Sequence, residues 1–395
     1  MTQAFAGIRI VDFTQVLAGP FATQQLAQQG AEVIKIEPLH TGDMTRRLMA
    51  GTQKGDAPSF LTCNLGKKSL ALDLKSAAAQ EVVRRLVVSA DVVVENFRPG
   101  VMQRLGFGYD QLSAIKEDIV YCSISGFGQT GPSAHKPAYD GAIQAASGMM
   151  AVTGHAATGP TRTGYMPVDM ATALNAAFAI AAALYRRKCT GSGEHLDVAM
   201  LDTAMVLQAP QISAHLVNGI VPELLGNRSP TKAPTANLFD CADGCLQVVA
   251  MKEAQVEALF EALGLTDHYP AFVGEANRIA RTDEINALIQ PVFAGASVDH
   301  WQEKLAAAGV PAAVIRNYPE LIGDQQLAGR PILTRTPVST DSTVQVVSAS
   351  HTARNDPPRV ARPAPDLGEH TDEILKELGF AATTINDWRL QECIG

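Results

Sequence analysis

Asp169 is the first candidate for a reactive side chain, because it opens a long, Ala-rich and almost uncharged segment at residues 164–187. Ala has the highest helix propensity, Asp favours the start of a helix, and the cations Arg186 and Arg187 suit its end. The glycines at 191 and 193 supply a stop signal. The pattern predicts a helix with Asp169 at its N-terminus. Because few polar side chains lie along this helix, we expect it to be buried.

Two roles fit a carboxylate in this position. An aspartate at a helix N-terminus most commonly caps it by accepting hydrogen bonds from the first free backbone N–H groups. A carboxylate there is also held in place and kept ionised, which suits a nucleophile that attacks an acyl group. Both roles remain open for Asp169 from its local sequence, and one side chain can fill both.

The elements that position Asp169 follow an alternating pattern. Apolar strands alternate with helices over the first half of the chain, which predicts an α/β, Rossmann-like parallel sheet with helices on both faces. The expected strands are residues 8–13, 31–37, 69–74, 91–97, 119–125 and 195–198, and helices are expected at 21–29 and 77–88.

Ligands in such folds bind at the carboxyl ends of the strands. Three loops lie there: residues 15–20, residues 96–100 and the glycine-rich residues 126–132. Basic side chains also occur near strand ends, where they would suit the phosphates of a nucleotide, although most Lys and Arg residues are simply solvated. These residues are Lys67, Lys68, Lys75, Arg98 and Arg104.

The sequence GFGQTG at residues 126–131 matches the spacing of a dinucleotide-binding loop. In that motif a helix starts inside the loop, so that its N-terminus meets the pyrophosphate, and an acidic residue follows about 20 positions later. Here Pro132 and a polar stretch follow instead. We therefore expect a glycine-rich loop and no NAD site.

The length of 395 residues favours two domains. We expect residues 1–204 to form the N-terminal part of a large Rossmann-like domain, and residues 331–395 to form a return linker and the C-terminal part of the same domain. Residues 205–235 are loosely patterned and are expected to link it to a smaller α+β domain at 236–330. That domain starts with a hairpin around an Asp-Gly turn and continues with helices at 252–263, 282–293 and 297–308.

The net charge of −8 argues against a general nucleic-acid-binding protein. The six cysteines show no metal-binding spacing, and Cys241 and Cys245 have no matching pair nearby, so no metal site is expected. The scattered cysteines fit a reducing cytoplasm. No signal peptide is evident, and the longest apolar run, residues 176–185, is too short to span a membrane.

The motifs together resemble the class III CoA-transferase family (CaiB/BaiF type), which includes formyl-CoA transferase. Seven shared segments occur in the family's order along nearly the whole chain. They are residues 8–37 (IRIVDFTQVLAGPFATQQLAQQGAEVIKIE), 70–75 (LALDLK), 91–112 (DVVVENFRPGVMQRLGFGYDQL), 119–132 (IVYCSISGFGQTGP), 137–140 (PAYD), 168–177 (VDMATALNAA) and 367–380 (LGEHTDEILKELGF). The resemblance implies a CoA-transferase whose large Rossmann-like domain and smaller domain form an interlocked homodimer.

The resemblance also implies roles for individual residues. Asp169 takes the position of the family's nucleophile, which forms a mixed anhydride with the acyl group and then an aspartyl-CoA thioester. Acyl-CoA and a carboxylic acid are the implied substrates, and backbone groups near Ala18 are expected to stabilise the anhydride oxygen. The residues at matching CoA-binding positions are Val16, Ala18, Leu72, Lys75, Asn96, Phe97, Arg104 and Tyr139.

The sequence departs from formyl-CoA transferase at two positions that handle oxalate: Leu17 replaces a Gln, and Leu48 replaces a Trp. The family's glycine run in the small domain is also missing, so oxalate is not the expected substrate. Three arginines are candidates for holding the far carboxylate of a dicarboxylate, with a surface role as the simpler alternative. They are Arg46, Arg47 and Arg162.

Two alternatives to a CoA-transferase remain. A related α-methylacyl-CoA racemase has a His where this chain has Tyr139, and a racemase needs an acid and a base across the α-carbon. A racemase would exchange the α-proton with solvent and transfer no acyl group. A non-catalytic CoA-binding protein would bind CoA without forming a covalent intermediate.

Overall fold

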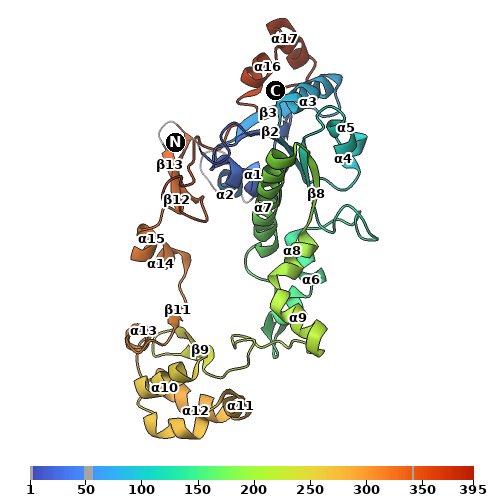
Figure 1. The fold of residues 1–395 in the computed structure, drawn as a ribbon. Coiled ribbons are helices and arrows are strands. Elements are labelled where there is room, and N and C mark those ends of the chain that lie inside the picture. Colours follow the sequence, from blue (N-terminus) through green and yellow to red (C-terminus); the bar gives the residue numbers. More distant parts are fainter. Residues whose placement is uncertain (1–2, 49–56, 340–341) are drawn as a thin grey trace. The chain divides into compact units, whose positions relative to one another are not determined.

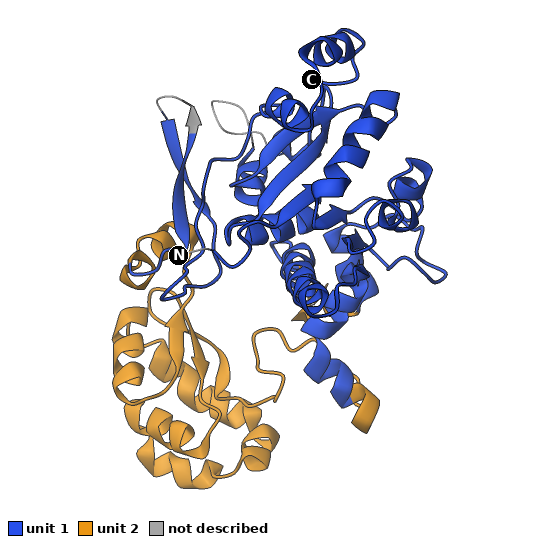
Figure 2. Ribbon diagram, turned by 45° about the horizontal axis from the view of Figure 1, so that its top comes forward, with its two compact units in different colours: residues 1–147, 163–214, 329–395 blue, residues 148–162, 215–328 orange. Residues whose placement is uncertain are grey.

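A computed structural model describes residues 3–48, 57–339 and 342–395. The chain divides into two compact units, which are coloured separately in Figure 2. The first unit comprises residues 1–147, 163–214 and 329–395, and the second comprises residues 148–162 and 215–328. Each unit has its own hydrophobic core.

The first unit is built on a six-stranded, all-parallel sheet in the order β3-β2-β1-β4-β5-β8. The strand order reverses between β1 and β4, and in such folds ligands bind at that switch point. Every strand predicted for this sheet is confirmed. The strands are β1 (Arg9–Asp12), β2 (Glu32–Pro38), β3 (Lys68–Leu72), β4 (Val92–Glu95), β5 (Val120–Ser125) and β8 (Glu194–Ala199).

Helices cover both faces of this sheet, because alternate residues of each strand point to opposite sides. On one face, α1 (Ala18–Ala27) and α7 (Pro167–Thr190) pack on a core that contains Ile10 and Val92. On the other face, α3 (Ala77–Ser89) and α16 (Thr371–Glu377) pack on a core that contains Val11 and Val93. Figure 1 shows α7 running beside α1 across the sheet.

Helix α7 confirms the predicted helix and ends at Gly191, whose φ of +75° suits glycine. The helix was expected to be buried, but it is buried only in part, since Leu174, Phe178 and Tyr185 are exposed. At 24 residues, α7 is long and apolar enough to cross a membrane by length and composition alone, unlike the shorter run judged from the sequence. A core helix of a soluble protein passes the same test, so this is weak evidence for a membrane span.

Shorter elements complete the first unit. Several of them were not predicted, among them the hairpin of β12 and β13 and helix α9, which starts in the first unit and lies where the sequence pattern was expected to be loose. The further elements are η1 (Met44–Arg46), α2 (Pro58–Asn64), α4 (Val101–Arg104), α5 (Tyr109–Ser113), α6 (Asp140–Ala146), α8 (Met200–Leu207), α9 (Ala209–Asn218), β12 (Leu333–Ser339), β13 (Ser342–Val347) and α17 (Ala382–Leu390).

The second unit has a three-stranded antiparallel sheet in the order β11-β10-β9. The predicted hairpin and helices of this region are confirmed, and they pack around Phe239, Phe293 and Trp301. The main elements are β9 (Ala236–Asp240), β10 (Cys245–Val249), β11 (Ala312–Val314), α10 (Glu253–Ala262), α12 (Thr282–Phe293) and α13 (Val298–Ala307).

Candidate active site

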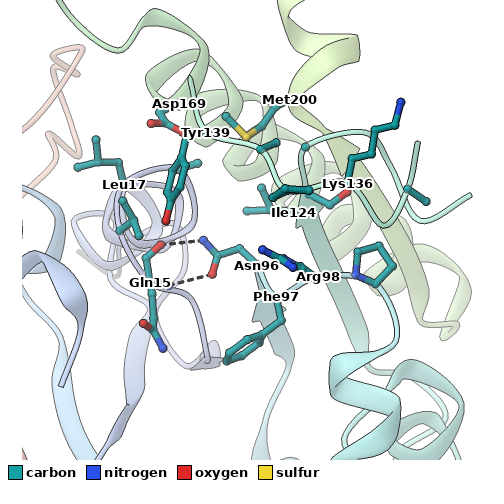
Figure 3. A pocket seen from close by; sticks show the side chains of 18 residues that line it. Gln15, Leu17, Asn96, Phe97, Arg98, Ile124, Lys136, Tyr139, Asp169 and Met200 are labelled. Carbon is teal, nitrogen blue, oxygen red and sulfur yellow. Dashed lines mark hydrogen bonds between the residues drawn. The ribbon is translucent and has the colours of Figure 1, made fainter. Parts of the chain in front are cut away.

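A cavity of about 260 Å³ lies in the first unit at the carboxyl ends of β1, β4 and β5. Its walls come from the loops after these strands and from the first turn of α7, which contributes Asp169 (Figure 3). The three loops predicted to carry a ligand site therefore meet at one cavity. Of the CoA-binding candidates, five line it: Val16, Ala18, Asn96, Phe97 and Tyr139.

Asp169 does not cap its helix, so the capping role considered from the sequence is wrong. Helix α7 starts at Pro167, and Asp169 is its third residue. The carboxylate of Asp140 provides the cap, because its Oδ2 accepts the N–H groups of Val168 at 2.8 Å and of Asp169 at 3.0 Å. Among the described residues the Asp169 carboxylate has no hydrogen-bond or ion-pair partner, which leaves it available to the cavity.

The environment of Asp169 raises the pKa of its carboxyl group to about 7. Burial is the larger cause, since it disfavours the charged form, and the nearby negative charge of Asp140 adds to it. A carboxylate with a pKa near neutrality is more basic than an ordinary aspartate and is still substantially ionised at neutral pH. Such a shift in a cavity is typical of a functional carboxylate.

Asn96 joins the loops that follow β1 and β4, the two strands at the switch point of the sheet. Its side-chain oxygen accepts the N–H of Gln15 at 2.9 Å, and its side-chain nitrogen donates to the carbonyl of Gln15 at 2.7 Å. Figure 3 shows these two bonds joining the loop after β4 to the loop after β1. Asn96 therefore fixes the spacing of the two loops that form the floor of the cavity.

The first loop is strained at Val16, a β-branched residue with a φ of +72°. The conformation is held by Asp43, whose Oδ1 accepts the N–H of Val16 at 3.2 Å. Asp43 is itself buried against the ammonium group of Lys35 at 2.9 Å, and this partner helps to hold the pKa of Asp43 below its usual value despite the opposing effect of burial. Strain at a cavity that is supported by a buried ion pair indicates a functional conformation.

The loop after β4 has a similar clamp, because the Oε2 of Glu95 accepts the N–H of Phe97 at 2.8 Å. Burial raises the pKa of Glu95 to about 7, and none of the residues that the structure describes supplies a cation to pair with it. Asp43, Glu95 and Asp140 thus each hold a backbone amide of the site. The sequence approach missed all three as site residues. Glu95 and Asp140 are sequence neighbours of the predicted site residues Asn96 and Tyr139, and this proximity is the signal that could have identified them.

The start of α1 contributes to the wall of the same cavity. Leu17 and Ala18 line it, and the N–H groups of Ala18 and Gly19 have no acceptor in the part of the chain that the structure describes. Gly19 lies so close to Thr14 that a Cβ atom there would approach the Thr14 Cβ to 2.3 Å. The helix N-terminus therefore offers free donors where negative charge is favoured.

A second cavity of about 490 Å³ lies beside the first, and Gln15 and Phe97 line both. Leu72 and Lys75 line the second cavity, so the two cavities divide most of the CoA-binding candidates between them. Arg104 lines neither cavity. It is exposed at the end of α4, next to Leu105, which lines the second cavity.

The structure separates the basic candidates into two groups. Lys67 is buried against Asp12 at 2.9 Å, and Lys68 pairs with Glu32 and Glu373, so these two lysines are structural. Lys75, Arg98 and Arg104 are exposed and form no ion pair among the described residues, which leaves them available to an anion.

The three arginines considered for a dicarboxylate do not gather at the cavity. Arg46 is buried, pairs with Glu37 at 2.7 Å and stacks on Phe60, so it is a structural residue. Arg47 donates to the carbonyl of His40, and Arg162 belongs to the second unit. Leu48, which replaces a Trp of formyl-CoA transferase, is exposed and does not line the cavity.

The glycine-rich loop is not a dinucleotide-binding motif. After β5 the chain continues in turns, and the next helix, α6, begins only at Asp140. No helix starts within residues 126–131, so the helix start that a dinucleotide-binding loop requires is missing from this loop. Among the described residues no group of three His, Cys, Asp or Glu side chains is placed to hold a metal ion.

Comparison with known proteins identifies relatives along nearly the whole chain. The family model for CoA-transferase family III matches residues 5–371. An acetyl-CoA:oxalate CoA-transferase of Acetobacter aceti is 36% identical, covering 96% of each chain, and a succinate–glutarate CoA-transferase of Agrobacterium fabrum is 33% identical, covering 94% of this chain and 95% of its own. The crystal structure of a CAIB/BAIF family protein from Brucella suis superimposes with a TM-score of 0.85 at 31% identity, covering 96% of this chain and all of that one.

Proposed function

The chain belongs to CoA-transferase family III, and we propose that it moves CoA from an acyl-CoA donor to a carboxylic acid acceptor with Asp169 as the covalent nucleophile. The observation that carries this proposal is the unpaired Asp169 carboxylate in the cavity at the switch point, with a pKa raised to about 7. A positioned, partly desolvated carboxylate is what attack on a thioester requires.

The proposed reaction proceeds through two kinds of aspartyl intermediate. The Asp169 carboxylate attacks the thioester carbonyl, the C–S bond breaks, and CoA leaves as its thiolate with a mixed anhydride on Asp169. The thiolate then attacks the aspartyl carbonyl, forms an aspartyl-CoA thioester and releases the donor acid. The acceptor carboxylate attacks this thioester, and the same steps run in reverse to give the new acyl-CoA and free Asp169.

The N-terminus of α1 is suited to stabilise the negative oxygen that develops in each of these steps. The free N–H groups of Ala18 and Gly19 are preorganised donors, and such donors aimed at developing charge contribute strongly to acyl transfer. Leu17 stands where formyl-CoA transferase has a Gln. Backbone donors would therefore carry more of this role here.

CoA itself would extend from the first cavity into the second, since Gln15 and Phe97 line both. Its thioester would lie near Asp169, and its nucleotide end would lie against Leu72 and Phe97, with Lys75 and Arg104 available to phosphate groups. The volume of the first cavity, about 260 Å³, favours small carboxylic acids as the acyl groups exchanged.

Hydroxylamine trapping tests this proposal directly. We expect protein incubated with an acyl-CoA that serves as donor and quenched with hydroxylamine to carry a hydroxamate on the peptide that contains Asp169, because hydroxylamine attacks an activated carboxyl group. Peptide mass spectrometry over a panel of acyl-CoAs would detect it and identify the donors. Unmodified peptide with every acyl-CoA, in protein that binds CoA, would contradict the covalent route and favour a racemase or a binding protein.

We also propose that the chain forms the interlocked homodimer expected from the family. Large apolar side chains are exposed on neighbouring helices of the first unit: Phe178 and Tyr185 on α7 are each 72% exposed, and Val206 on α8 is 71% exposed. Patches of this kind usually mark protein interfaces. We expect sedimentation velocity to show a particle of twice 41.9 kDa and Phe178→Glu to weaken it. A monomer at micromolar concentration would contradict this proposal.

A further inference from the structure

Glu392 occupies a backbone position that normally belongs to glycine. Helix α17 ends in a pair of hydrogen bonds, from the N–H of Cys393 to the carbonyl of Trp388 at 2.9 Å and from the N–H of Glu392 to the carbonyl of Arg389 at 3.1 Å. This arrangement places the residue after the helix in the left-handed region, where glycine is preferred. Glu392 has a φ of +53° there, so a side chain is kept at a site where it strains the backbone.

No contact within the fold accounts for the glutamate. Its carboxylate has no hydrogen bond or ion pair in the described part of the chain. Glu392 is one of the residues that line the second cavity. An outlier of this kind at a cavity supports a role in binding, since folding alone would favour glycine at this position.

The position of Glu392 is fixed by the residues that follow it, which run antiparallel to the end of β3. The N–H of Asp73 donates to the carbonyl of Cys393 at 3.0 Å, and the N–H of Gly395 donates to the carbonyl of Ala71 at 3.2 Å. Ile394 is buried in the core of the first unit. Figure 1 shows this end of the chain against β3. Glu392 is therefore held beside the loop that carries Lys75.

The walls of the second cavity combine apolar residues with polar ones, and the polar ones are Gln15, His40, Thr41, Asp73, Lys75 and Glu392. The walls suit the two faces of a flat ring, while the free carboxylate of Glu392 offers a hydrogen-bond acceptor and Lys75 offers a cation. An ionised carboxylate has no proton to donate and can only accept hydrogen bonds, so the ring must present an N–H group to it. The apolar wall residues are Ile36, Pro38, Leu39, Leu72, Leu74, Phe97 and Leu105.

We propose that Glu392 accepts a hydrogen bond from the exocyclic amino group of the adenine of CoA and thereby determines specificity for the nucleotide end of the substrate. This inference rests on the proposed function, because it takes CoA as the ligand of the two adjoining cavities. Adenine has apolar faces and an amino donor. Hypoxanthine, its deaminated counterpart, has a carbonyl oxygen in place of the amino group, which would face the carboxylate with no proton between them.

The test compares Glu392→Gly with the wild-type protein by titration calorimetry, using CoA, its hypoxanthine analogue and 4′-phosphopantetheine, which lacks the nucleoside. We expect the substitution to weaken CoA binding roughly ten-fold or more, as the loss of a hydrogen bond to a charged group does. The wild-type protein should bind the hypoxanthine analogue more weakly than CoA, whereas the variant should bind both alike. Binding of phosphopantetheine should not change.

Thermal unfolding separates this role from a structural one. Because glycine relieves the strain, Glu392→Gly should raise the unfolding temperature while it weakens CoA binding. Glu117→Gly, at an exposed glutamate outside both cavities, is the matched control and should bind CoA normally. Unchanged CoA binding, or an equal loss for CoA and phosphopantetheine, would overturn the inference. If wild-type protein binds no CoA, the proposed function fails, and the inference fails with it.

Discussion

Asp169→Ala is expected to abolish CoA transfer, with kcat reduced by about 10⁴-fold or more, as for the loss of a covalent nucleophile in other enzymes. The reason is that no other side chain takes over the attack. Tyr139, which lines the same cavity, is a phenol and cannot form the carboxylic anhydride. Asp169→Asn should fail equally, because its uncharged amide lacks the carboxylate that attacks the thioester.

The fold should survive this change. The Asp169 carboxylate has no partner among the described residues, and Asp140 rather than Asp169 caps helix α7. We therefore expect a circular dichroism spectrum and an unfolding temperature close to those of the wild-type protein, together with retained CoA binding.

The measurement is the initial rate of acyl-CoA formation with a donor identified by hydroxylamine trapping. Asp299→Ala is the matched control, because Asp299 is also in the first turn of a helix but is exposed and lies outside the site. That control should keep full activity. Near-normal transfer by Asp169→Ala would exclude Asp169 as the nucleophile.

Asp140→Asn should change the pH dependence of the reaction. In the wild-type protein, kcat/KM should rise as the pH increases through about 7, because only the ionised form of Asp169 attacks and its pKa in the free enzyme is raised to that value. Removing the negative charge of Asp140 leaves burial as the remaining cause of the shift. The pKa of Asp169 should then fall, so the rising limb of the profile should move to lower pH.

The same substitution should lower the free energy of unfolding. The Oδ2 of Asp140 accepts two backbone N–H groups of α7, while its Oδ1 accepts the side-chain amide of Gln144 at 2.5 Å. An asparagine cannot satisfy all three donors, and a buried donor left unpaired costs about 1–3 kcal/mol. Urea unfolding would measure this loss.

The two readouts distinguish the roles of Asp140. If Asp140 only caps α7, its substitution would lower stability and leave the pH profile of kcat/KM in place. A profile that moves to higher pH would contradict the proposed effect of Asp140 on Asp169.

The sequence by itself determined the architecture of the first unit and the place of its site. Runs of apolar residues set the strands of the sheet, because strands buried on both faces need continuous apolar side chains. The alternation of these strands with helices implied parallel pairing, and parallel pairing brings the carboxyl ends of the strands to one edge. The meeting of the loops at residues 15–20, 96–100 and 126–132 follows from this topology.

Only the tertiary structure decided which charged side chains are paired within the fold and which remain available at the candidate site. Local sequence allowed Asp169 to cap its own helix, but the cap comes from Asp140, 29 positions earlier in the chain. Lys67 and Arg46 resembled available cations, yet each is buried against a carboxylate: Lys67 against Asp12, 55 positions earlier in the chain, and Arg46 against Glu37. The partner of a charge depends on which groups approach it in space, and short-range patterns do not encode that approach.

Glu392, near the end of the chain, is a second case in which short-range sequence patterns do not reveal the surroundings of a side chain. The sequence around Glu392 predicts no ligand contact, because its role depends on a left-handed backbone and on the pairing of residues 393–395 with the end of β3, more than 300 positions away. Local propensities determine whether a segment is a helix or a strand. The neighbours that turn a side chain into part of a site are set by long-range packing, which only the folded chain provides.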